Sequence, residues 1–228
     1  MLALERRKLI LGASALALAG CAGEAGNVGV ETTPDDMVLG AENAPVTLLE
    51  YGSTMCGHCK QFHDIVWEAL KSEYIDTGKV RFIFREILSP GQPPIPVVVL
   101  AEFQLARCEN ATPQQYFDRV SVLFEQQPEV YAAGAGGMEG IRAKLIDIGG
   151  AAGFTPDQVQ ACIADRAGAQ RVERINALFT RDGAKTPIAP EDLGTPLFFL
   201  NGVFLPTAEI STLDGLRQKL DAAVAAGK

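Results

Sequence analysis

The chain has 228 residues, of which 47% are hydrophobic and 21% are charged, and its net charge at pH 7 is −8. This length and composition are typical of a globular protein with one sizeable domain, or one domain that carries an insertion. Without residues 1–20 the chain keeps 17 basic and 27 acidic residues. The acidic balance leaves no basic patch, which argues against binding to nucleic acid or to an anionic membrane surface.

The N-terminus has the pattern of an export signal. Residues 6–8 are Arg-Arg-Lys, and the apolar run that follows, residues 9–20, is too short to span a bilayer. The run ends in Leu-Ala-Gly before Cys21, which resembles the bacterial lipobox. The resemblance implies that residues 1–20 are cleaved off and that Cys21 carries a lipid. The alternative is an ordinary signal peptide with Cys21 left free. The lipoprotein signal and the ordinary signal peptide both predict a periplasmic or other extracytoplasmic protein. With the lipoprotein signal, the protein would also be tethered to a membrane.

The export signal is followed by a predicted tether and then by alternating strands and helices. Residues 21–36 are rich in Gly, Ala and polar groups and are predicted to form a flexible tether. Residues 46–51 are predicted to form a buried strand, residues 57–74 an amphipathic helix, and residues 80–87 a second strand. The order strand, helix, strand indicates a right-handed parallel crossover.

Residues 89–183 show helical patterns and no convincing strand. Two helix starts are marked by Thr112-Pro113 and Thr155-Pro156, each with Gln three residues after the Thr. The glycine-rich stretch 134–140 does not match the dinucleotide-binding fingerprint and is predicted to be a loop. One predicted helix face consists of Val97, Ala101, Gln104, Leu105 and Cys108.

Strand character returns near the C-terminus. Residues 196–200 and 203–205 flank Asn201-Gly202, a turn pair typical of a tight hairpin, and a final helix is predicted after Ser211. A strand–helix–strand half and a strand–strand–helix half therefore enclose about ninety residues of helix.

Four cysteines remain when Cys21 is set aside, and four cysteines allow three disulfide connectivities. The short spacing of Cys56 and Cys59 favours their mutual pairing, which leaves Cys108 to pair with Cys162. Both of these lie on apolar helix faces, so we expect a structural disulfide, worth roughly 4 kcal/mol for a loop of about fifty residues. A regulatory or second catalytic pair is the alternative.

Cys56-Gly57-His58-Cys59 can be half of a zinc site or a redox pair. A zinc site needs four ligands, but the other cysteines are isolated and the histidines are His58 and His63. We expect no metal and interpret His63 as an exposed helix residue, with Phe62 and Trp67 in the core. A Cys-x-x-Cys pair between a strand and a helix is typical of thiol–disulfide exchange.

The complete pattern resembles the DsbA-like branch of the thioredoxin superfamily, across residues 37–226. The resemblance rests on the strand–Cys-Gly-His-Cys–helix unit, the helical insertion, Thr195-Pro196, the hairpin and the last helix. It implies an α/β thioredoxin-like fold formed by residues 37–88 and 184–228, with residues 89–183 as an inserted helical domain. It implies no cofactor other than the redox-active disulfide.

The motif has a chemistry of its own. A thiolate at the first turn of a helix is favoured by free backbone N–H groups and by the helix dipole, so the pKa of Cys56 should fall. His58 can donate to this thiolate or repel protons when charged. Stabilising the reduced state makes the pair an oxidant, with a potential expected at about −180 to −120 mV.

Cys59 is expected to be the resolving thiol, and Glu50 the residue that exchanges its proton. Glu50 lies in an otherwise apolar strand, where a carboxylate is costly unless it is used. By the resemblance it matches the buried acidic residue below the active site, and its pKa should be raised by burial. The alternative is a Glu at a strand end that faces solvent.

Thr195-Pro196 matches the position of the superfamily's cis-proline, which lies beside the active-site sulfurs and pairs with substrate backbone. Several strong oxidants of this family carry Val before that proline, whereas Thr is common in isomerase relatives, so Thr195 leaves the direction of electron flow open.

The sequence therefore predicts a monomeric disulfide oxidase that acts on unfolded exported proteins and is reoxidised by a DsbB-like membrane partner. One alternative is an isomerase or reductase that a membrane donor keeps reduced. The other is a peptide-binding chaperone in which the cysteines are incidental.

Overall fold

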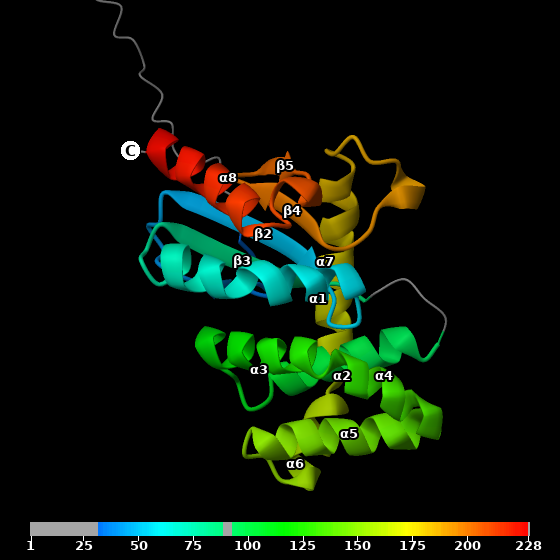
Figure 1. Ribbon diagram of the computed structural model, residues 1–228. Coiled ribbons are helices and arrows are strands. Elements are labelled where there is room, and N and C mark those ends of the chain that lie inside the picture. Colours follow the sequence, from blue (N-terminus) through cyan, green and yellow to red (C-terminus); the bar gives the residue numbers. More distant parts are fainter. Residues whose placement is uncertain (1–31, 89–92, 228) are drawn as a thin grey trace, which may run out of the picture.

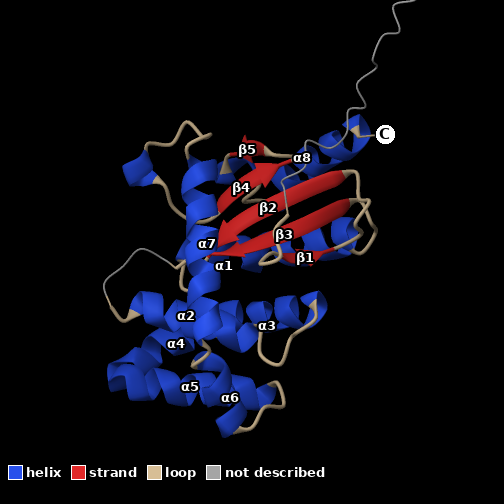
Figure 2. Ribbon diagram, turned by 180° about the vertical axis from the view of Figure 1, so that it is seen from behind, coloured by secondary structure: helices blue, strands red, loops and turns tan. Residues whose placement is uncertain are grey.

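The computed structural model describes residues 32–88 and 93–227. Its centre is a five-stranded sheet in the order β1-β3-β2-β4-β5 (Figures 1 and 2). Strands β2 and β3 are parallel, and the other neighbours are antiparallel. The bounds are β1 Met37–Leu39, β2 Val46–Gly52, β3 Val80–Glu86, β4 Leu197–Leu200 and β5 Val203–Leu205. The predicted parallel pairing of β2 and β3 and the predicted hairpin are confirmed; β1 was not predicted as a strand.

Each face of the sheet is covered by helix. One face is covered by a continuous helical run and by the last helix, α8 (Leu213–Ala226). The run consists of α1 (Gly57–Phe62), η1 (His63–Trp67) and η2 (Leu70–Ile75). Figure 2 shows α7 (Arg166–Gly183) across the opposite face. Because side chains alternate along a strand, Leu48 and Leu49 of β2 enter separate hydrophobic clusters on the two faces.

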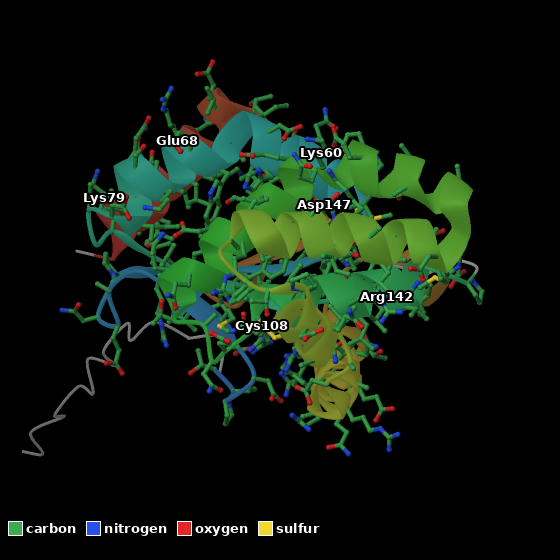
Figure 3. The ribbon with its side chains drawn as sticks, turned by 90° about the horizontal axis from the view of Figure 1, so that it is seen from below. Lys60, Glu68, Lys79, Cys108, Arg142 and Asp147 are labelled. Carbon is green, nitrogen blue, oxygen red and sulfur yellow. A yellow bond between two sulfur atoms is a disulfide. The ribbon has the colours of Figure 1, made fainter. Side chains whose placement is uncertain are left out.

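A layer of five helices lies below the sheet in the view of Figure 1. It contains α2 (Ile95–Ala106), α3 (Pro113–Glu125), α4 (Gln127–Ala133), α5 (Gly137–Ala151) and α6 (Pro156–Ile163). Short 3₁₀ turns are η3 (Gly134–Gly136), η4 (Pro190–Asp192) and η5 (Thr207–Glu209). Capping boxes at Thr112 and Thr155 start α3 and α6, as predicted. In Figure 3 this layer faces the viewer, with Asp147 on α5 in front.

The glycine-rich stretch 134–140 was predicted to be a loop, and that was wrong. It consists of the turn η3 and the first residues of α5. Only Gly137 has a positive φ, +66°, where a residue without Cβ lets the chain turn between helices. Burial of Ile141, Leu145 and Ile148 then compensates for the low helix propensity of glycine.

Two further observations concern the predicted division of the chain into tether, sheet domain and insertion. The insertion has no core of its own, because Phe103 and Phe117 join Phe82 of the sheet in one cluster, and α7 runs from the helical layer onto the sheet. Residues 33–36, assigned to the tether, are fixed: the fully buried side chains of Asp36 and Arg85 form an ion pair at 2.8 Å. The signal peptide and Cys21 lie outside the described residues. None of the described helices combines the length with the apolar composition that a membrane span requires.

Candidate active site

Cys56 caps the N-terminus of α1, directly after the buried turn that follows β2. Its backbone is extended, with φ −89° and ψ 121°, and the Cys59 N–H donates to its Sγ at 3.4 Å. On the other side the Cys56 thiol donates to the carbonyl oxygen of Thr195 at 3.2 Å. The sulfur is half-buried, so it is within reach of a substrate and remains in contact with fixed donors.

Hydrogen bonds that the Cys56 sulfur accepts lower its pKa to about 5. The main cause is hydrogen bonding from the Cys59 side chain, and the Thr195 side chain and the backbone N–H groups of Cys59 and His58 add to it. Together they outweigh desolvation, which acts in the opposite direction. At neutral pH Cys56 is therefore a thiolate, the form that acts as nucleophile and leaving group.

Cys59 has the opposite character. Its side chain is fully buried and burial is the main reason that its pKa is raised well above that of an ordinary thiol. Both motif cysteines are present as free thiols in this structure. Cys56 is thus the half-buried, reactive sulfur and Cys59 the protonated sulfur behind it.

Glu50 lies below this pair. It has the same orientation in β2 as Leu48, toward α1, and only 4% of the residue is exposed. Desolvation, followed by the charge of Cys56, raises the pKa of Glu50 well above its usual value. Glu50 and Cys59 line one pocket of about 10 Å³, near the lower limit for one water molecule. The charge of Glu50 contributes to the raised pKa of Cys59, so the carboxyl is close enough to affect the protonation of that thiol.

Gly52, two residues after Glu50, leaves room for this arrangement. A Cβ at that position would lie 2.6 Å from the ring of Phe84 and 2.9 Å from Oε1 of Glu50. Close approach explains why the strand ends in glycine here.

Thr195 and Pro196 lie beside the motif, and the bond between them is cis, the isomer that the resemblance implies. A surface hollow of about 340 Å³ adjoins them. It is lined by His58, Gln61, Phe62, Thr195, Pro196, Thr207, Ala208 and Ser211. The hollow extends from the cis-proline to His58, two residues after Cys56.

The two histidines differ in surroundings. His58 is exposed and lines the hollow, and its backbone N–H contributes to stabilising the Cys56 thiolate. His63 was predicted to be exposed, which was wrong. It is partly buried, 3.0 Å from the Ser121 hydroxyl, and stacked on Trp67, because α3 packs over it. Burial lowers its pKa to about 4.

Cys108 and Cys162 are joined by a disulfide with a Cα–Cα distance of 5.4 Å. The bridge links the residues after α2 to α6, in the helical layer (Figure 3). The disulfide therefore ties the segment after α2 to α6, while Cys56 and Cys59 stay outside it.

Sequence reasoning missed three side chains that contact the active-site loop: Glu102, Gln127 and Tyr131. The predicted face of α2 included Val97, which is 54% exposed; the buried face instead includes Glu102. An acidic residue within the apolar run Val-Val-Val-Leu-Ala-Glu-Phe was the signal that could have found it.

Comparison with known proteins agrees with this geometry. A family model described as thioredoxin matches residues 32–222. A Rickettsia conorii protein named "Putative protein-disulfide oxidoreductase" is 30% identical over 179 residues, 78% of this chain and 58% of the relative. Disulfide bond formation protein D of Bacillus subtilis is 31% identical over 109 residues, 46% of this chain and 47% of the relative. The chain spans about three fifths of the length of the rickettsial relatives.

Solved structures show the same fold. Wolbachia pipientis alpha-DsbA1 has a TM-score of 0.68 at 22% identity, over 88% of this chain and 96% of that one. Oxidised BdbD from Bacillus subtilis has a TM-score of 0.65 at 21% identity, over 86% of this chain and 97% of that one. At these identities the likeness is one of fold.

Proposed function

The chain belongs to the thioredoxin family, and we propose that it is a protein disulfide oxidoreductase that uses Cys56 and Cys59 as its redox pair. The observation that carries the proposal is the asymmetry of the two sulfurs. One is a half-buried thiolate at a helix N-terminus, and the other is a buried thiol above a buried carboxyl. A relative named as a putative protein-disulfide oxidoreductase and another named as a disulfide bond formation protein support the same reaction.

The proposed reaction begins from the Cys56–Cys59 disulfide. A substrate thiolate attacks Sγ of Cys56, which forms a mixed disulfide and expels Cys59 as a thiolate. Glu50 gives its proton to Cys59. A second substrate thiolate attacks the substrate sulfur of the mixed disulfide and expels Cys56 as a stable thiolate. The substrate loses two electrons and the enzyme pair gains them.

We propose that the direction in the cell is oxidation of exported proteins. A strongly stabilised Cys56 thiolate favours the reduced enzyme, and a pair with a stable reduced form is an oxidant. Regeneration then needs a membrane oxidant of the DsbB type. The competing assignment, an isomerase or reductase, is favoured by Thr195 before the proline. A chaperone does not need the arrangement of Cys56, Cys59 and Glu50, so that role would leave the arrangement unexplained.

The test uses the oxidised mature protein and a reduced, unfolded substrate with two cysteines. We expect stoichiometric substrate disulfide formation, abolished by Cys56→Ser. No transfer, or transfer that survives Cys56→Ser, would refute the redox assignment. Equilibration in glutathione buffers and an assay with scrambled ribonuclease separate oxidase from isomerase. A reducing potential with efficient unscrambling would reverse the direction, and aggregation suppression unaffected by replacing both cysteines would favour the chaperone.

The proposed location is extracytoplasmic, with a lipid anchor on Cys21. The basic residues, the short apolar run and the Leu-Ala-Gly-Cys21 end support it. Mass spectrometry of the protein from membranes should find a diacylglyceryl group on Cys21. An unmodified thiol at that position would contradict the anchor.

A further inference from the structure

The segment between β2 and Cys56 is held by side chains of the helical layer. Thr54, fully buried, donates from its hydroxyl to Oε2 of Glu102 in α2 at 2.5 Å. Gln127 of α4 donates from Nε2 to the carbonyl oxygens of Thr54 at 2.5 Å and Cys56 at 3.2 Å. The Tyr131 hydroxyl of α4 donates to the carbonyl oxygen of Met55 at 2.7 Å. Three consecutive residues that end at the reactive cysteine are therefore fixed from outside the sheet.

Glu102 is the unusual member of this set. The residue is fully buried, and within the described part of the chain its Oε1 has no hydrogen-bond partner. Burial raises the pKa of Glu102 to about 8. A buried carboxyl with one unsatisfied oxygen costs stability compared with an apolar side chain of similar size. The stability of α2 therefore does not explain why residue 102 is a glutamate. The contact of Glu102 with Thr54 does explain it.

We propose that Glu102 is a positioning residue for the reactive cysteine, acting through Thr54 to hold the active-site turn in place. Cys56 Sγ accepts a hydrogen bond from the Cys59 N–H at 3.4 Å. The geometry of this bond depends on where the turn places the Cys56 backbone. Because hydrogen bonds weaken steeply as distance and angle depart from their optimum, a turn released from α2 stabilises the thiolate less. The helical layer thereby sets the acidity of a sulfur that belongs to the sheet.

This inference rests on the proposed function for its purpose, but its test does not need the redox activity. The readout is the acid titration of the Cys56 thiolate in the reduced full-length protein, followed by ultraviolet absorbance. Thr54→Val keeps the shape of the side chain and removes the donor. Thr54→Ser keeps the donor. Glu102→Gln keeps an acceptor oxygen, and Glu102→Leu removes it. The exposed Glu68→Gln, on the helical run that begins with α1, is the matched control (Figure 3).

We expect Thr54→Val and Glu102→Leu each to reduce the acid ionisation constant of Cys56 about three- to tenfold, the equivalent of one hydrogen bond. Thr54→Ser, Glu102→Gln and the Glu68 control should stay within about twofold of the wild type. The double variant Thr54→Val, Glu102→Leu should not exceed the larger single effect, because both changes remove one interaction.

The inference is overturned if Thr54→Val leaves the Cys56 titration unchanged, whatever its effect on unfolding. Should Glu102→Leu fail to fold, Thr54→Val and Thr54→Ser carry the test alone, since both are small changes of shape. A wild-type protein that titrates as expected but transfers no disulfide would refute the proposed function and leave the role of Glu102 standing.

Discussion

The acidity of Cys56 gives the sharpest test of the site. The perturbation is Cys59→Ala, which removes the largest contribution to the lowered Cys56 pKa and leaves the backbone N–H groups in place. For the wild type, a pKa of about 5 means about 99% thiolate at pH 7, against about 1% for a thiol that titrates at 9.0. That is roughly a 100-fold larger reactive population.

We expect the titration midpoint to rise from about 5 in Cys59→Ala and to stay below 9.0. Absorbance titration of the reduced protein gives the midpoint, and the rate of alkylation at each pH checks it independently. Alkylation should rise less than the thiolate fraction, because a thiolate with a lower pKa is a weaker nucleophile. A wild-type midpoint near 9.0, or a midpoint that does not move in Cys59→Ala, would refute the reasoning.

The same shift predicts how stability depends on pH. Because the pKa of Cys56 is lower in the folded reduced protein than in the unfolded chain, ionisation stabilises the folded form. This contribution is complete above the unfolded-state pKa, near 9, and is lost as the pH falls through about 5. In the oxidised protein Cys56 does not titrate. The stability advantage that this thiolate gives the reduced form should therefore shrink from pH 9 to pH 5 and vanish below it.

Three further changes test other parts of the structure. Glu50→Gln removes the proton donor and should slow attack on the Cys56–Cys59 disulfide by about 10²-fold in stopped-flow measurements, without loss of stability. Replacing Cys108 and Cys162 together with Ala opens a loop of 54 residues and should lower the free energy of unfolding in urea by about 4 kcal/mol. Asp36→Asn breaks a fully buried ion pair with Arg85 and should cost about 3 kcal/mol in the same assay.

Each of these has a clear contrary result. An unchanged stopped-flow rate would remove Glu50 from the proton transfer. Unfolding within 1 kcal/mol of the wild type, as an approximate threshold for one interaction, would show that the disulfide or the ion pair is not structural. Thiolate titration in the disulfide and Asp36 variants serves as the control, because both lie outside the Cys56 surroundings and should leave the midpoint unchanged.

Local pattern was enough to predict much of this molecule. Runs of apolar and β-branched residues located β2 and β3, which are buried on both faces, and the Asn201-Gly202 pair located the hairpin. Helical periodicity located α1 and α8, because each helix buries one side in a fixed repeat. The capping boxes at Thr112 and Thr155 involve residues three apart, so the sequence contains the whole interaction. Cys56 and Cys59 were identifiable for the same reason: four residues at one helix start determine most of their chemistry.

Other features depend on which elements meet, and the sequence does not state that. The burial of His63 depends on α3 packing against the first helical run, and the fixing of Asp36 depends on Arg85, 49 residues away. Glu102 is 48 residues from Thr54, and its inward orientation follows from how α2 rotates against the sheet. The sequence by itself determined that a redox pair begins a helix after a buried strand. Only the tertiary structure decided which side chains hold that helix start in place, because hydrogen bonds and desolvation act through space between segments far apart in the chain.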